Sequence, residues 1–384
     1  LADRHYVAWL PPRIESALHK PQCECRSTSR APEERSPVLF QHAPLGRSPF
    51  TIEVANRLEL DTMTEPHAKT VLLTGATGFV GGNLYPTLLD AGWDVRCTTR
   101  DPARAAERMP DRDWVELDVE RPETFEPALE GCDAAFYLIH QVGQTDDYGA
   151  REVRAAERFR DAAAAAGLRR IVYLGGIEPA GPPSHHLESR LETGRALRDG
   201  DVSTVELRAA MIIGAGSASW RIVRDTAARL PAMLLPSWSR SRSEPVAIDD
   251  VVAALLGALE RDTDASECWD IPGPDALSGK EVFERAARLM GNDPLLVDVP
   301  FLTPRLSSYW LRFVTRSDYE LAKELVDGLE YDILADSDDF WDIIGHPDRL
   351  SFDEAAARAL ESDNYPANRW ERVIKRLTPA AKGR

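Results

Sequence analysis

A glycine-rich turn between an apolar strand and a helix constrains the fold of this chain more than any other feature. Gly75, Gly78 and Gly81 recur at a spacing of three, after the apolar run at residues 71–74 and before a helix pattern that reaches about Leu89. Such a turn lets the backbone approach a pyrophosphate, and the helix N-terminus adds N–H groups and a positive dipole. In this strand–turn–helix context the spacing predicts the phosphate-binding turn of a dinucleotide-binding Rossmann domain.

Strand and helix patterns alternate after this turn. Strands are expected at residues 71–74, 94–99, 114–119, 134–139, 170–174 and 204–208. The first helix follows the glycine turn and reaches about Leu89, and the others are expected at about 103–108, 122–129, 148–166 and 187–198. Strands joined through helices form right-handed crossovers and a parallel sheet. We therefore predict an α/β fold, with a doubly wound Rossmann core in residues 63–210. Residues 211–384 are predicted to form a smaller mixed α/β region that completes the sheet and supplies the substrate side.

Residues 1–62 differ from the rest of the chain. They contain equal numbers of basic and acidic residues, so the net charge of −17 lies entirely in residues 63–384. Two interpretations stay open: the natural start is Met63 and the segment is upstream sequence from a misplaced start, or it is a disordered extension. It lacks the apolar run of a signal peptide. Five scattered cysteines fit a reducing compartment, so we expect a cytoplasmic location.

The acidic charge limits the partners of the chain. A net charge of −17 repels nucleic acid phosphates, so no nucleic acid partner is expected. Six lysines stand against 40 arginines, which suits either a halophile's salty cytoplasm or a GC-rich genome. The chain has no run of 18 apolar residues, so no membrane-spanning helix is expected. Cys23, Cys25 and His19 lack a second ligand pair, so no metal site is expected.

The ends of the predicted strands supply the other candidates for a cofactor site, because ligands bind beyond the carboxyl ends of parallel strands. Arg100 follows the second strand, where an arginine accommodates the 2′-phosphate of NADP; NADP(H) is thus the preferred cofactor, with NAD(H) as the alternative. Arg100 could instead be a solvated arginine paired with Asp101 or a nearby acid. Asp118 and Val119 follow the third strand, where side chains usually flank the adenine, and Leu138 and Ile139 end the fourth strand, beside the expected ribose and nicotinamide. The remaining candidates follow the turn and the other strands: Thr77, Phe79, Val80, Gly175 and Met211.

Several segments resemble a known superfamily. The glycine turn, residues 246–251 (VAIDDV) and residues 269–274 (WDIPGP) resemble short-chain dehydrogenases/reductases of the extended and atypical branches. A closer resemblance is to NmrA-like NAD(P)-binding proteins and to relatives of the 39-kDa-type subunit of respiratory complex I. It is carried by residues 137–140, 173–176, 184–194, 208–214 and 303–310. The resemblance covers about residues 70–330 and implies a Rossmann fold, a bound nicotinamide dinucleotide and, for most members, oxidoreductase activity.

The chain departs from the superfamily at its catalytic residues. The superfamily uses a Tyr-x-x-x-Lys pair and a serine after the fifth strand, and the lysine lowers the pKa of the tyrosine. Here Gly175 and Gly176 stand at the serine position, and His186-x-x-x-Arg190 stands where the pair is expected. The one Tyr-x-x-x-Lys sequence, at residues 319–323, lies far beyond the sixth strand, and we interpret it as coincidence.

Three functional interpretations follow. In the first, the chain reduces a carbonyl, enone or quinone-like small molecule, with His140 or His186 as proton donor and Arg190 orienting a cofactor ribose or substrate oxygen. In the second, it binds NADP(H) without turnover, as a redox sensor or as a structural or assembly partner of a respiratory complex. In the third, the aromatic residues 300–314 meet a partner or the inner face of a membrane, although such a segment also suits the lid of a substrate pocket. The sequence indicates neither the substrate nor the oligomeric state.

Overall fold

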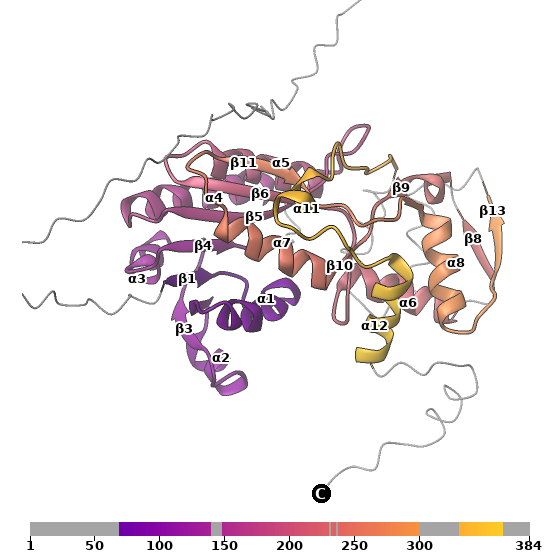
Figure 1. Cartoon of the computed structure of the whole chain (residues 1–384), viewed down its shortest axis with the longest axis horizontal. Coiled ribbons are helices and arrows are strands. Elements are labelled where there is room, and N and C mark those ends of the chain that lie inside the picture. Colours follow the sequence, from indigo (N-terminus) through magenta and orange to yellow (C-terminus); the bar gives the residue numbers. More distant parts are fainter. Residues whose placement is uncertain (1–68, 140–147, 230–231, 236, 300–329, 364–384) are drawn as a thin grey trace, which may run out of the picture. The chain divides into compact units, whose positions relative to one another are not determined.

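A seven-stranded parallel sheet is the centre of the fold (Figure 1). The computed structural model of the chain describes residues 69–139, 148–229, 232–235, 237–299 and 330–363. The strands run in the order β11-β6-β5-β4-β1-β2-β3, and each pairs in parallel with its neighbours. Their bounds are β1 (Thr70–Leu73), β2 (Asp94–Thr99), β3 (Asp113–Glu116), β4 (Ala134–Tyr137), β5 (Arg170–Gly176), β6 (Ser203–Ala209) and β11 (Glu267–Asp270). Because β1 pairs with both β2 and β4, the strand order reverses there, which confirms the predicted doubly wound fold.

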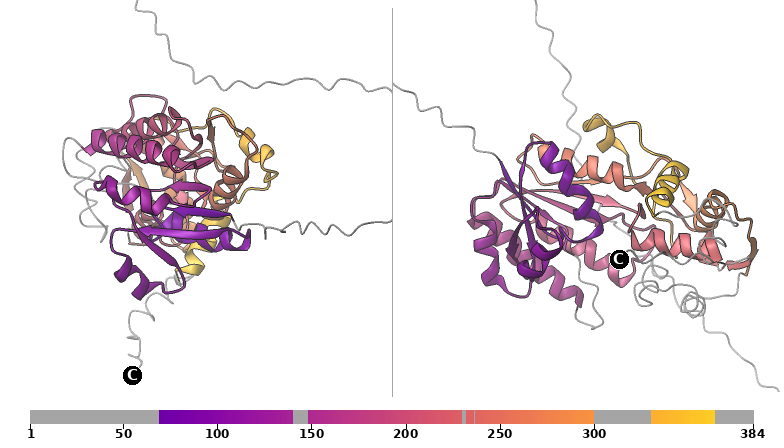
Figure 2. Two further views of the ribbon diagram at one scale, coloured as in Figure 1. Left: turned by 90° about the vertical axis from the view of Figure 1, so that its left-hand side faces the viewer. Right: turned by 90° about the horizontal axis from the view of Figure 1, so that it is seen from below.

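Helices cover both faces of this sheet (Figure 2). One face packs against α1 (Phe79–Asp90), α7 (Ile248–Glu260) and α11 (Asp339–Ile343). The other packs against α3 (Phe125–Leu129), α4 (Tyr148–Ala165) and α5 (His185–Arg198), with the 3-10 turn η1 (Pro122–Thr124) before α3, while α2 (Pro102–Arg108) lies beside β2 and β3. Within β1, Val71 and Leu73 belong to the first core and Leu72 to the second. This two-sided burial explains why the strands are apolar runs.

A third core lies in the C-terminal part of the chain. It joins α6 (Ala218–Arg229), α8 (Gly279–Leu289) and α12 (Phe352–Ser362) with the strand pairs β7 (Ile212–Ile213)–β10 (Val246–Ala247) and β9 (Arg242–Ser243)–β12 (Leu277–Ser278). A further pair joins β8 (Ala232–Leu235) and β13 (Leu295–Asp298), and the 3-10 turn η2 (Ser237–Arg240) follows β8. Trp220 and Phe352 meet edge to face inside it, 6.3 Å between centroids. Capping boxes that start at Ser278 and Ser351 fix the first turns of α8 and α12.

Two strands end at least two residues earlier than their sequence patterns predict. The third strand, predicted at residues 114–119, ends at Glu116, because the Asp118 N–H donates to Thr124 Oγ1 (3.0 Å) and the chain turns. The fourth, predicted at 134–139, ends at Tyr137, because the Leu138 N–H donates to a threonine hydroxyl of the β1 end instead of a neighbouring strand. Apolar patterns continue into buried turns, so they overestimate strand length.

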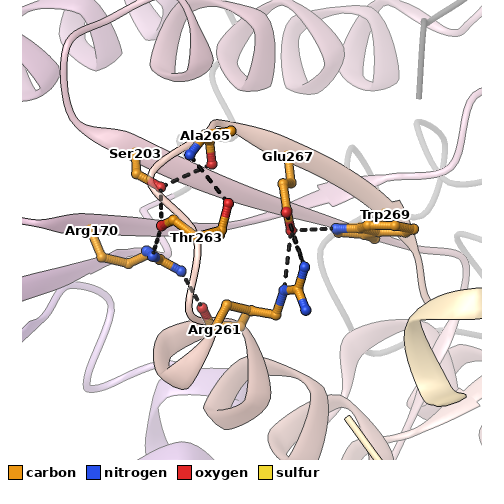
Figure 3. Close-up of polar contacts among 8 residues, drawn as sticks. Arg170, Ser203, Arg261, Thr263, Ala265, Glu267 and Trp269 are labelled. Carbon is orange, nitrogen blue, oxygen red and sulfur yellow. Dashed lines mark hydrogen bonds and ion pairs between the residues drawn. The ribbon is translucent and has the colours of Figure 1, made fainter. Parts of the chain in front are cut away.

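Polar contacts hold the edge strand β11 near the amino ends of its neighbours β5 and β6 (Figure 3). Arg170, the first residue of β5, donates to Ala258 O (3.2 Å) at the end of α7 and to the carbonyl oxygen of Thr263. Ser203, the first residue of β6, donates through Oγ to Ala265 O (3.0 Å). The Glu267 carboxylate accepts from Arg261 (3.0 Å) and from Trp269 Nε1 (2.9 Å). These contacts order the end of the sheet that is remote from the candidate site.

Some sequence predictions fall outside the described residues. They concern the segment 1–62, His140, residues 300–314 and the Tyr-x-x-x-Lys sequence at 319–323. The boundaries between residues 62 and 63 and between 210 and 211 remain predictions. None of the helices in the described ranges is both long and apolar enough to span a membrane, and no group of three His, Cys, Asp or Glu residues there could hold a metal ion.

Candidate functional site

The glycine turn has the close packing that its spacing predicts. Gly75 has a φ of +65°, in the left-handed region, and a Cβ on it would lie 2.7 Å from Leu138 O. A Cβ on Gly81 would lie 2.9 Å from the carbonyl carbon of Gly75. The Gly78 N–H donates to Gly75 O (2.8 Å), and Gly78 begins α1 without a side-chain cap. The first N–H groups of α1 are therefore left for an anion.

Thr74 fixes the neighbouring strand ends around this turn. This buried residue donates through Oγ1 to Phe136 O (2.8 Å) and accepts from the Leu138 N–H (2.7 Å). The two bonds join the carboxyl ends of β1 and β4, and they place Leu138 against Gly75 and leave Ile139 half-buried. The structure thus brings together the turn and the residues that were predicted to lie beside the ribose and nicotinamide.

Arg100 is an exposed cation directly after β2. Asp101 does not pair with it, because the Asp101 carboxylate caps α2 by accepting from the Arg104 N–H (3.1 Å). Among the described residues no carboxylate forms an ion pair with Arg100, so the alternative of a pair with Asp101 is wrong. The guanidinium remains able to bind an external anion at this strand end.

Asp118 and Val119 follow β3 at the place predicted to flank an adenine. Asp118 is half-buried, and its Oδ1 accepts from the Glu120 N–H (3.0 Å), which holds the carboxylate in one position. Val119 is buried in the core between the sheet, α3 and α4. Asp118 can therefore still present its second oxygen, whereas Val119 contributes packing.

The serine of the superfamily has no room at Gly175. Glu206 on β6 extends its carboxylate next to Gly175, and a Cβ on Gly175 would lie 2.8 Å from Glu206 Oε1. Gly194 of α5 provides the space on the other side of the same carboxylate. Burial raises the pKa of Glu206, and Arg198, 2.7 Å away, acts in the opposite direction. A buried ion pair therefore lies against Gly175, one of the two glycines that stand where the resemblance leads us to expect a serine.

His186 lies in the first turn of α5, where Ser184 caps the helix by accepting from the Leu187 N–H (3.4 Å). It is half-buried and belongs to a helix, not to a surface loop. Burial, and then the nearby Arg190, lower the pKa of His186 to about 4. At pH 7 roughly one molecule in a thousand then carries an imidazolium, so His186 is neutral before any ligand binds.

Arg190 lies one helical turn after His186 and reaches the carboxyl end of β5. It donates through Nη2 to Leu174 O (2.7 Å), and its own carbonyl oxygen accepts from Tyr173 Oη (3.0 Å). Its Nε is buried, with no hydrogen-bond partner in the described part of the chain. A buried donor without a partner is costly, and it fits a site that an external acceptor completes.

The two tyrosines buried in the described part of the sheet do not replace the missing catalytic one. Tyr137 and Tyr173 lie in the sheet core with their ring centroids 6.3 Å apart. Burial raises the pKa of both phenols. A catalytic tyrosine requires the opposite shift, so neither phenol suits proton exchange near neutral pH.

The C-terminal region reaches the turn through the segment after β7. A Cβ on Gly214 would lie 2.8 Å from Phe79 Cζ and 2.7 Å from Ile248 Cγ2, so the first residue of α1 packs against this segment. Met211, predicted to touch the cofactor, is half-buried against the third core. Val80 is likewise half-buried, and Thr77 is exposed. Sequence reasoning did not single out Gly214, although it lies in the segment 208–214 that carried the resemblance.

Comparisons with known proteins agree with this geometry. The NAD(P)H-binding family matches residues 75–228. A (4-alkanoyl-5-oxo-2,5-dihydrofuran-3-yl)methyl phosphate reductase of Streptomyces griseus is 29% identical over 226 residues, which is 58% of this chain and 74% of the relative. The photosystem II assembly factor Ycf39 of Synechocystis is 24% identical over 255 residues, 63% of this chain and 74% of that protein.

A solved structure shows the same fold. The triphenylmethane reductase of Citrobacter, complexed with NADP(H), has a TM-score of 0.61 and 17% identity, and the match covers 76% of this chain and all of that one (100%). Residues 75–228 therefore form an NAD(P)H-binding domain, and the chain has both a reductase and an assembly factor among its relatives. The resemblance to the complex I subunit remains a prediction.

Proposed function

Because residues 75–228 form an NAD(P)H-binding domain, we propose that this protein is an NADP(H)-dependent oxidoreductase that acts on a carbonyl, enone or quinone-like small molecule. The NADP preference rests on Arg100, the exposed cation at the end of β2 whose neighbour Asp101 caps α2 instead of pairing with it. A guanidinium binds a phosphate through paired, charge-assisted hydrogen bonds, whereas a ribose hydroxyl offers a single weaker partner.

The residues present fit a nicotinamide dinucleotide. The glycine turn is a cradle that a Cβ would fill, and the uncapped start of α1 would hold the pyrophosphate. Asp118 would accept from the adenine, and the buried Arg190 Nε would donate to the nicotinamide ribose. The dinucleotide supplies the hydride.

His186 is the described candidate for proton delivery to a substrate oxygen. Its pKa of about 4 makes it a neutral imidazole in the free protein. The negative charge of a bound dinucleotide favours the imidazolium and raises this pKa, so proton donation by His186 depends on cofactor binding. Arg190 beside it would orient the ribose or the substrate oxygen. His140 is the second candidate, outside the described residues.

Binding without turnover is the alternative function. It is favoured by the absence of room for a serine at Gly175 and by the raised pKa of Tyr173. It is also favoured by the similarity to Ycf39, an assembly factor. In this case the chain is an NADP(H) sensor or an assembly partner. We also propose a cytoplasmic location. Residues 300–314 would provide a contact with a membrane or with a protein complex.

A cofactor titration tests both functions. We expect the full chain to bind NADPH more tightly than NADH and to lose absorbance at 340 nm with one of a panel of carbonyl, enone and quinone acceptors. Tight NADPH binding without oxidation by any acceptor would favour the sensor or assembly function. Unchanged turnover in both His140→Ala and His186→Ala would eliminate these proton donors.

Arg100→Ala tests the cofactor preference. It should weaken NADPH binding about 10- to 100-fold, the value of a hydrogen-bonded charge, and leave NADH binding within about twofold. Arg108 is an exposed arginine at the end of α2, and Arg108→Ala is the matched control. This control should change neither the NADPH nor the NADH affinity. Tighter binding of NADH than of NADPH to the unmodified chain would refute the preference.

A further inference from the structure

The glycine turn contacts a charged residue from a distant part of the chain. We infer that Arg112 is a positioning residue of the dinucleotide site, which aims a backbone N–H of the turn at the pyrophosphate. This inference rests on the proposed dinucleotide binding and deepens it. It assigns to Arg112 a role in binding any nicotinamide dinucleotide, in contrast to the selective role of Arg100.

Arg112 contacts both the turn and the helix that the turn opens. It lies in the connection between α2 and β3, and its Nη1 donates to Ala76 O (2.9 Å), 36 residues away in the sequence. Its guanidinium lies over the ring of Tyr85 in α1, with Cζ 4.2 Å from the ring centroid. The Tyr85 hydroxyl in turn donates to Asp111 O (3.1 Å), so the connection before β3 is itself tied to α1.

The bond to Ala76 O sets the orientation of one peptide unit. In a planar trans peptide the C=O and the N–H point in opposite directions. With Ala76 O held on Arg112, the N–H of Thr77 points to the other side of the same unit. Thr77 is exposed, and within the described residues no acceptor bonds to its N–H. The turn therefore presents a fixed donor at the position where its spacing predicts a pyrophosphate.

The charge of Arg112 strengthens this donor. A cation that bonds to a carbonyl oxygen polarises the peptide, and the N–H at the other end becomes the stronger donor. No carboxylate of the described ranges forms an ion pair with Arg112, and its buried Nε has no partner there. A buried Nε without an acceptor is unfavourable in a purely structural role, and the positive charge of this half-buried side chain becomes favourable when the neighbouring turn binds an anion.

Substitution of Arg112 by methionine, which keeps the side-chain stem and removes the donor and the charge, tests the inference. We expect NADPH and NADH binding to weaken by the same factor, about tenfold, so that the ratio of the two affinities stays within about twofold of the unmodified chain. Arg112→Lys, which keeps a charged donor, should recover part of the loss. Both are measured by calorimetric titration of the full chain well below the melting temperature of each variant.

Arg96→Met is the matched control. Arg96 on β2 also donates to backbone carbonyls, Ala128 O (3.1 Å) and Glu130 O (2.6 Å), but these lie away from the turn. The control should lower the melting temperature and leave both affinities unchanged. Unchanged affinities in Arg112→Met would overturn the inference, and so would a loss confined to NADPH, which would indicate direct contact with the 2′-phosphate. If the unmodified chain binds neither dinucleotide, the proposed function fails instead.

Discussion

Replacement of Gly81 by alanine tests the turn geometry with a control in the next residue. A Cβ on Gly81 would lie 2.9 Å from the carbonyl carbon of Gly75 and 3.0 Å from Ala76 Cα. A Cβ on Gly82, which is in the same helix turn, would meet nothing within 4 Å. Gly81→Ala therefore tests both the close approach to Gly75 and the change in helix propensity, whereas Gly82→Ala tests the change in helix propensity alone.

The distances set the expected magnitudes. Carbon atoms in contact lie about 3.5–4.0 Å apart, so Gly81→Ala requires the turn to move by roughly 0.5–1 Å. Overpacking of this kind costs about 1–3 kcal/mol of unfolding free energy, and alanine returns about 1 kcal/mol of helix propensity. A displacement of about 1 Å in a positioned group is worth up to about 100-fold in function, so dinucleotide affinity should fall at least about tenfold. Gly82→Ala should gain about 1 kcal/mol of stability.

The assay is a calorimetric titration of each full-length variant with NADPH and NADH, beside urea unfolding followed by circular dichroism. Gly81→Ala should lose affinity for both dinucleotides, and Gly82→Ala should bind both as the unmodified chain does. Wild-type affinity in Gly81→Ala would refute the argument from close approach. An equal loss in both variants would show that the helix, not the turn, controls binding.

Two further predictions concern buried polar groups. Arg198→Ala should lower the unfolding free energy by about 3–5 kcal/mol at pH 8, because it leaves the Glu206 carboxylate buried without its partner. Because burial raises the pKa of Glu206, the folded variant binds a proton that the unfolded chain has released. The loss of unfolding free energy should therefore shrink as the pH falls through the folded pKa of Glu206. An equal loss of unfolding free energy in urea at pH 5 and at pH 8 would contradict this prediction. Thr74→Val should cost about 1–3 kcal/mol and weaken the binding of both dinucleotides, because it removes the hydroxyl between Phe136 O and Leu138 N. Thr74→Ser keeps that hydroxyl, and a loss of affinity as large as that of Thr74→Val would argue against the bridge.

The sequence predicts the sheet well because its signals are local. The spacing of Gly75, Gly78 and Gly81 is legible within seven residues, and the strands buried on both faces form short apolar runs. The alternation also predicts that Leu138 lies at the cofactor edge of the sheet, and the structure has it against Gly75, although β4 ends two residues earlier than predicted. These features depend on neighbours in the chain, which a single sequence displays directly.

The parts of the site that the sequence did not predict depend on distant contacts. Arg112 reaches Ala76 across 36 residues, and Leu138 reaches Thr74 across 64. An arginine in a connection before a strand resembles any solvated arginine, and its sequence position does not show that its guanidinium lies on Tyr85. The sequence likewise did not predict the role of Glu206, because the ion pair between this strand residue and Arg198 forms only in the folded chain.

The environment of β5 suits neither a serine at Gly175 nor proton exchange by Tyr173. Glu206 fills the space at Gly175 that a serine would need, and the same carboxylate is held by Arg198 from α5. A serine at this position would require the Glu206 carboxylate to move away from Arg198, and disruption of a buried ion pair is unfavourable. Because burial raises the pKa of Tyr173 in the same strand, this tyrosine does not supply the proton either. Under the proposed oxidoreductase function, proton delivery at this strand end would therefore fall to His186 or to a group outside the described residues, and a bound dinucleotide would first have to raise the low pKa of His186.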